Sequence, residues 1–174
     1  MSGISISPIE LLITGVPQGF LFVLALYIFT RTNTDIIKYV IQSLILIVVT
    51  YLLRFLPINL GVHTMLILFA LIILFMAFNK VSLAKFVNAI VSVVIIAIII
   101  IITELLNVLF LDLVFGQAET NILIYHSSPL IKSLSEIPST VIFALIILAS
   151  YFVLAKIDKN KKVKNGAIGA KNSE

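Results

Sequence analysis

The chain has 174 residues, of which 61% are hydrophobic and 11% are charged, and its formal net charge is +4. Its mean hydropathy is +1.22. A water-soluble domain of this size needs more polar residues than this chain has to cover its surface. The composition therefore indicates an integral membrane protein. There is no cysteine, which excludes disulfides, thiolate metal sites and a cysteine nucleophile.

Five long apolar runs predict five membrane-spanning helices, because about 20 apolar residues cross roughly 30 Å of hydrocarbon. The predicted spans cover approximately residues 9–30, 36–55, 63–78, 86–110 and 139–155. Pro17, which lies between two glycines, should distort the first span. The fourth apolar run continues to Phe115, so this helix must tilt or extend past the membrane surface.

The connections between these spans are mostly short and polar. Residues 31–35 and 79–85 form turns, and residues 116–138 form a longer loop whose apolar residues favour a helix lying in the interface. Ser139 is the expected N-cap of the last span. The predicted fold is therefore all-α: a membrane helix bundle over residues 1–157, followed by a disordered basic cytoplasmic tail over residues 158–174.

The distribution of basic residues predicts the orientation. With five spans, ten of the twelve Lys and Arg residues fall on one side of the membrane, and only Arg54 and Lys132 fall on the other. Basic residues near spans concentrate on the cytoplasmic side. We therefore expect a protein of a bacterial cell membrane with its N-terminus outside and its C-terminus inside.

Several polar residues collect at the predicted outer end of the bundle and form a candidate ligand-binding cluster. Its members are Glu10, Arg54, Asn59, His63, Glu104 and Asn107. Ionisable groups within spans are costly and usually face the bundle interior, so Arg54 is expected to pair with Glu104 or with Glu10. The alternative interpretation is that charged side chains at span ends simply reach the headgroups. Three amides inside spans, Gln18, Gln42 and Asn88, are expected to form interhelical hydrogen bonds. For Asn88, which is close to the inner surface, the alternative is contact with headgroups only.

The chain shows no motif of a known catalytic class. It has no HExxH, no GxSxG and no glycine-rich phosphate loop, so we expect no enzyme activity, no cofactor and no metal. The net charge lies mainly in the tail, next to a span, and therefore indicates the cytoplasmic side and anionic lipid rather than nucleic acid.

Two segments together resemble a known family. ELLITGVPQGF, residues 10–20, pairs a Glu with a mid-helix Pro, and YLLRFLPINLGVHT, residues 51–64, carries an Arg, a Pro and Gly-x-His-Thr. Both resemble the multi-pass membrane sensor region of Firmicute GHKL-type, AgrC-like sensor histidine kinases, over roughly residues 8–155. The resemblance points to Glu10, Arg54 and His63 as important, together with four positions that we class as structural: Pro17, Pro57, Gly61 and Thr64.

The resemblance also implies how the protein would signal. Such kinases continue from the last span into a dimerising helix and an ATP-binding domain, whereas this chain ends soon after its last span. We therefore expect a stand-alone sensor-like membrane protein that senses a ligand or a membrane state at the outer face. It would signal through a partner, either a histidine kinase or another membrane protein. The alternative is the substrate-binding membrane subunit of a small-solute transporter. The sequence leaves the oligomeric state open.

Overall fold

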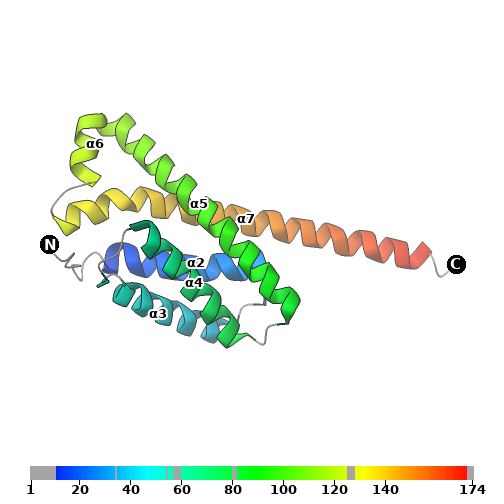
Figure 1. Ribbon diagram of the computed structural model, residues 1–174. Coiled ribbons are helices and arrows are strands. Elements are labelled where there is room, and N and C mark those ends of the chain that lie inside the picture. The colour runs from blue at the N-terminus through cyan, green and yellow to red at the C-terminus, as the bar shows by residue number, and fades with distance from the viewer. Residues whose placement is uncertain are drawn as a thin grey trace.

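The computed structural model describes residues 11–33, 35–53, 55–56, 60–79, 82–124 and 128–171, and every regular element in these ranges is a helix. The chain runs through η1 (Leu11–Gly15), α2 (Val16–Thr30), α3 (Ile36–Leu53), α4 (Leu60–Phe78), α5 (Leu83–Phe115), α6 (Gln117–Ile124) and α7 (Pro129–Lys171). The predicted all-α membrane helix bundle is confirmed (Figure 1).

Four of the five predicted spans satisfy the length and composition of a membrane-crossing helix. They are Leu11–Thr30, Ile36–Leu53, Leu83–Phe115 and Leu130–Asn160. The remaining predicted span, residues 63–78, corresponds to α4, which has 19 residues. Its apolar part, Val62–Phe78, is shorter than the four helices above. At 1.5 Å per residue α4 rises about 28 Å, which is close to the thickness of the hydrocarbon layer.

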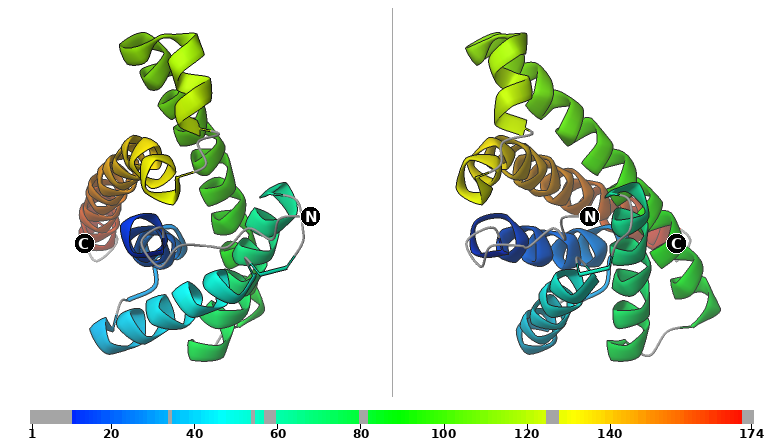
Figure 2. Two further views of the ribbon diagram at one scale, coloured as in Figure 1. Left: turned by 90° about the vertical axis from the view of Figure 1, so that its left-hand side faces the viewer. Right: turned by 60° about the vertical axis from the view of Figure 1, so that its left-hand side comes forward.

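α2 is the central helix of the bundle and contacts α3, α5 and α7 (Figure 2). The buried side chains of Leu26 and Tyr27 on α2 pack with Leu71 and Phe75 on α4 and with Ile96 on α5. The rings of Tyr27 and Phe75 meet edge to face with their centroids 5.7 Å apart. Large apolar side chains on the outer faces of the helices stay exposed, as expected for helices that face lipid.

The first span contains the irregularity expected from Pro17. Leu11–Gly15 form a turn of π-helix, and Pro17 lies at the start of the α-helix that follows. A proline has no N–H to bond to the carbonyl four residues earlier, and a π-turn is one way in which a helix accommodates the loss. The next turn of α2 brings Gly19 against α3, where a Cβ atom on the glycine would overlap Cγ1 of Ile47.

Both glutamines form the interhelical hydrogen bonds expected from the sequence. Gln42 Nε2 donates to the carbonyl of Leu74 at 3.2 Å and so joins α3 to α4. Gln18 Nε2 donates to Oγ1 of Thr140 at 3.4 Å and joins α2 to α7. Such bonds align neighbouring helices in a medium where no water can satisfy the amides.

The last helix differs most from the prediction. α7 begins at Pro129, ten residues before the expected N-cap Ser139, and continues to Lys171 through the region predicted to be a disordered tail. Pro138 lies inside α7, and Ser139 Oγ donates to the carbonyl of Glu136 within the helix rather than capping it. α6 lies within residues 116–138, the segment whose apolar residues favour a helix. The far end of α7 extends beyond the other helices (Figure 1).

Candidate functional site: a buried polar layer

The structure describes only part of the predicted outer cluster. Glu10, Arg54, Asn59 and the structural Pro57 lie outside the described residues, so the pairing of Arg54 with a carboxylate stays a prediction. Gly61 belongs to α4.

Two predicted residues, His63 and Thr64, lie in the first turns of α4, and both are half-buried. This placement agrees with the prediction that His63 lies near an end of a span.

The two cluster residues on α5 lie in different environments. Glu104 is exposed, whereas Asn107 is only 8% exposed. The prediction that Glu104 faces the bundle interior is therefore wrong. Side chains three residues apart on a helix point in directions that differ by about 60°, so one can face outward while the other is buried. The part of α5 beyond the core packs only one side against its neighbours, and Asn107 is on that side.

Asn107 belongs to a group of buried polar side chains where α5, α6 and α7 meet. We call this group the polar layer; its members are Asn107 on α5, Thr120 on α6, and Ser133 and Ser135 on α7. Asn107 Nδ2 donates to the backbone carbonyl of Ser135 at 3.0 Å, which ties α5 to α7. Ser135 Oγ donates to the carbonyl of Lys132 at 2.7 Å.

α7 is enclosed on more than one side at this end of the bundle. Positions two apart on a helix point in nearly opposite directions, yet Ser133 and Ser135 are both buried. α7 contacts α5, α6 and η1 here, which explains how both sides are covered. Figure 2 shows η1 and the beginning of α7 side by side at this end, with α6 above them. The layer thus holds the first turns of α7 within the fold.

Two oxygen atoms of the polar layer are buried without a hydrogen-bond partner among the described residues. They are Oδ1 of Asn107 and Oγ1 of Thr120, and the Thr120 side chain is 2% exposed. Buried polar atoms normally have partners, and an exception often marks a functional site or a bound molecule. Because all four side chains are uncharged, the layer can donate and accept hydrogen bonds to a neutral group.

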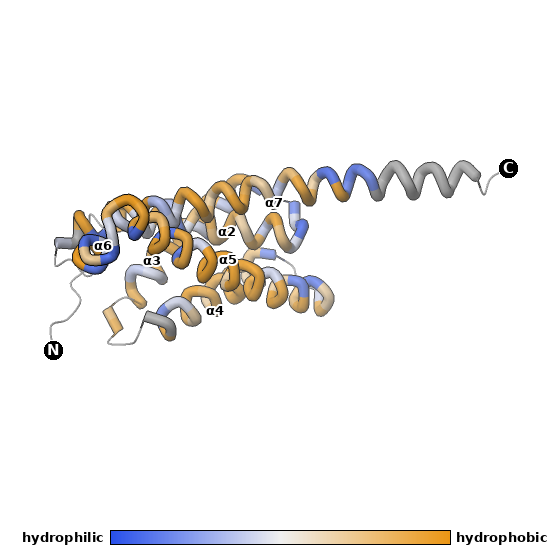
Figure 3. Tube along the Cα trace, turned by 90° about the horizontal axis from the view of Figure 1, so that it is seen from above, coloured by the Kyte–Doolittle hydropathy of each residue, from blue (hydrophilic) through white to orange (hydrophobic). Residues whose placement is uncertain are grey.

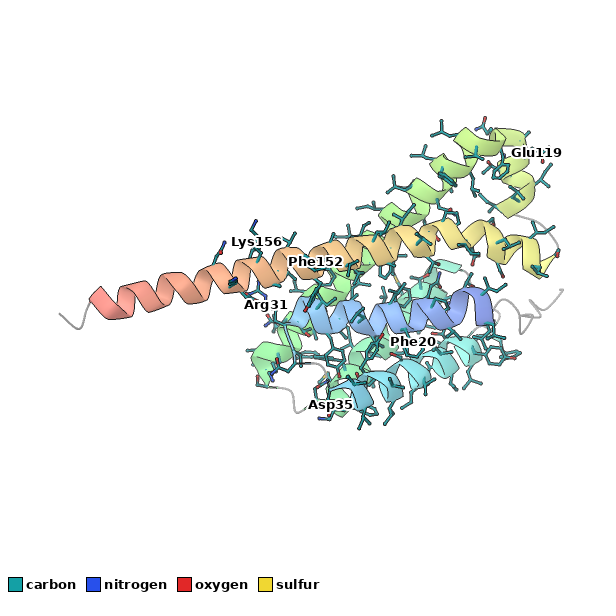
Figure 4. The ribbon with its side chains drawn as sticks, turned by 180° about the vertical axis from the view of Figure 1, so that it is seen from behind. Phe20, Arg31, Asp35, Glu119, Phe152 and Lys156 are labelled. Carbon is teal, nitrogen blue, oxygen red and sulfur yellow. The ribbon has the colours of Figure 1, made fainter. Side chains whose placement is uncertain are left out.

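The surroundings give no sign of a catalytic or metal centre. In the described ranges, no three His, Asp or Glu residues come close enough to hold a metal ion. Glu119, in the first turn of α6, is exposed and lies at the outer edge of the fold (Figure 4).

Sequence reasoning identified Asn107 but missed the other three members of the layer. Thr120, Ser133 and Ser135 fall within the segment predicted to be a loop, where hydroxyl residues carry no signal. One feature of the sequence could have indicated their place: Ser133 and Ser135 lie just before the apolar run that follows Pro138. They are predicted to be part of that helix only if the helix can begin before the proline.

The chain was compared with known proteins at three levels. No protein-family model, no curated protein and no solved structure matches it. The resemblance to AgrC-like sensor regions consequently stays a prediction.

Proposed function

We propose that the protein is a sensor-like membrane protein that responds to a ligand or a membrane state at the polar layer and signals through a partner at the opposite end of α7. The observation that supports this proposal is the hydrogen bond from Asn107 to the Ser135 carbonyl, which lies within a buried polar layer at one end of a helix whose other end extends clear of the bundle.

The length of α7 suits such coupling. The helix rises 1.5 Å per residue, so Ser135 and Asp158 are about 35 Å apart along its axis, slightly more than the roughly 30 Å hydrocarbon layer. A continuous helix transmits a shift or rotation at one end to the other end, and movements of 1–2 Å are typical of helices that switch. A change at the polar layer would then be felt where α7 leaves the bundle.

The chemistry of the polar layer limits the kinds of signal to which it can respond. Its side chains are neutral, and two of its oxygens have no partner in the described part of the chain: Asn107 Oδ1 accepts hydrogen bonds, and the Thr120 hydroxyl can donate or accept one. This favours a hydrogen-bond donor that is neutral, or a change in the packing of the surrounding bilayer, over an inorganic anion. A ligand shifts a conformational equilibrium only by its difference in affinity for the two states, so the layer must differ between them.

A spin-label experiment tests the coupling directly. Because the chain has no cysteine, single cysteines at Thr32 after α2 and at Lys159 on α7 can be labelled without background. We expect Asn107→Leu to change the distance distribution between these two labels, since the bond that fixes α7 against α5 is lost. The control is Asn121→Leu, because Asn121 is exposed and bonds only within α6.

Crosslinking from the C-terminal end of α7 in native membranes tests the partner. We expect a histidine kinase or another signalling membrane protein, captured less well from Asn107→Leu than from the control. Capture of ATPase subunits would instead support the transporter alternative. An unchanged label distance in Asn107→Leu would contradict the coupling whatever partner is found.

A further inference from the structure

A cavity of about 350 Å³ lies at the end of the bundle opposite the polar layer. Its lining is formed by the end of α2, the first turns of α5 and one turn of α7, and includes Arg31, Asn88, Ser92 and Leu154. The exposed Arg31 and Asn88 are at its mouth, whereas Ser92 is buried and donates its hydroxyl to the Asn88 carbonyl at 2.7 Å. The cavity is therefore an open hollow with a charged side chain at its rim and a buried serine in its wall.

A second cavity, of about 360 Å³, continues along the same helices. It is lined mostly by apolar side chains of α7, among them Ile146 and Val153, and by Phe29 of α2. Phe29 and Leu154 line both cavities, so the two adjoin. Together they form a site with a polar end at the membrane surface and an apolar groove that runs into the membrane-spanning part of α2 and α7.

Among the residues that line the first cavity, Arg31 carries the charge. Arg31 lies at the left-handed C-cap of α2, which directs the chain away from the helix. Figure 4 shows Arg31 beside α7, the helix that also carries Lys156. Lys85, three residues before Asn88, is also exposed. The negative charge at this site is the carboxylate of Asp158, whose Oδ1 accepts a hydrogen bond from Arg31 Nη1 at 2.8 Å.

We propose that these adjoining cavities bind one anionic phospholipid, with its phosphate at Arg31 and an acyl chain in the groove between α2 and α7. A guanidinium suits this role, because it presents five N–H donors in a fork that matches phosphate oxygens. The lipid phosphate and the Asp158 carboxylate then compete for Arg31. Lipid binding therefore loosens the attachment of α7 to the end of α2, independently of any signal at the polar layer.

The competition makes two single substitutions act in opposite directions. Both Arg31→Gln and Asp158→Asn break the ion pair, so a purely structural pair predicts the same outcome for both. We expect Arg31→Gln to lower retention of anionic phospholipid about tenfold, as for the loss of one charged hydrogen bond, and Asp158→Asn to raise it. The measurement is native mass spectrometry of the full chain released from nanodiscs of mixed phosphatidylglycerol and phosphatidylcholine.

The matched control is Lys38→Gln. Lys38 is an exposed basic residue at the same end of the bundle that lines neither cavity and lies 3.9 Å from Asp35. Equal losses in Lys38→Gln and Arg31→Gln would mean general attraction to a negative surface and would overturn the site. Retention of lipid by Arg31→Gln at the level of the unchanged chain would overturn it as well.

The apolar groove is tested by filling it. Ala149 lines the groove, whereas Ala155 on the same helix does not, so Ala149→Phe should lower lipid retention and Ala155→Phe should not. Inorganic phosphate at millimolar concentration should fail to displace the lipid, because it cannot occupy the groove. Displacement by phosphate, or no effect of Ala149→Phe, would show that the site takes a free anion and not a lipid.

Discussion

At the scale of single residues, side-chain size decides how closely the helices approach. Gly19 of α2 faces Ile47 of α3, and there is no space between them for even a methyl group. Helices in membranes gain stability mainly from close packing, for which small residues are suited. Gly19 is therefore needed for the contact between the first two spans, beyond its effect on the geometry of α2.

We predict that Gly19→Leu lowers the stability of the bundle by about 1–3 kcal/mol, the usual cost of overpacking. The thermal unfolding midpoint of the protein in detergent measures this change. Ala84→Leu is the control, because Ala84 is exposed in the first turn of α5. Equal midpoints for the two variants would contradict the close approach of α2 to α3.

Asn107 is the second residue whose environment leads to a prediction. Asn107→Leu should cost only about 0.6 kcal/mol, the average for an interhelical hydrogen bond in a membrane protein. Asn107→Asp should cost more, because an ionised carboxylate cannot donate to the Ser135 carbonyl and would be a buried charge facing an oxygen. Unfolding in a denaturing detergent ranks the two variants, and the reverse order would place Asn107 outside the polar layer.

At the scale of elements, α7 is the helix that sets this fold apart from a simple bundle of spans. It combines a buried beginning in the polar layer, a membrane-spanning middle and an end that leaves the bundle, all without interruption at Pro138. In Figure 3 its apolar middle is followed by a hydrophilic turn where it leaves the other helices. The ion pair from Arg31 to Asp158 is at this exit.

We predict that residues 158–171 are helical in the intact protein. Backbone carbon chemical shifts of the labelled protein should show helical values through this range. Lys162→Pro should abolish them from about residue 158 onward, because proline removes a bond and clashes with the preceding turn. Lys162→Ala serves as the control. Random-coil shifts in the unchanged chain would instead support the disordered tail predicted from composition.

At the scale of the whole molecule, the connections alternate between the two ends of the bundle. The turn that follows α2 and the one that precedes α5 lie at one end, and α6 with the beginning of α7 lies at the other (Figure 1). Arg31, Lys38 and Lys85 belong to the first end, and Lys132 belongs to the second. The arrangement agrees with the side assignment by which the sequence predicts the orientation.

We predict that α4 completes a fifth crossing, so that the two termini lie on opposite sides and the C-terminus is cytoplasmic. Reporter fusions at each terminus and after Gly116 measure this topology. The fusion after Gly116 should report the outer side. If both termini reported the same side, α4 would not cross, and the spans would be Leu11–Thr30, Ile36–Leu53, Leu83–Phe115 and Leu130–Asn160.

The sequence by itself determined the class of fold and the position of the apolar helices. Long hydrophobic runs indicate membrane-spanning helices, because a segment in lipid must form all its backbone hydrogen bonds within itself. The interhelical bonds of Gln18 and Gln42 followed from the same reasoning, since an amide within a span needs a partner. The resemblance to AgrC-like sensor regions and the pairing of Arg54 within the candidate ligand-binding cluster remain predictions.

Only the tertiary structure decided which polar residues meet. Glu104 and Asn107 look equivalent in the sequence, yet packing of α5 on α7 buries one and exposes the other. Ser133 and Ser135 became part of a helix because enclosure by α5, α6 and η1 stabilises the segment before Pro138 more than its local composition does. The two adjoining cavities likewise require α2 and α7, which are far apart in the chain, to lie side by side. Burial and contact across helices depend on their relative rotation, and periodicity within a single span does not specify that rotation in lipid, where every face is apolar.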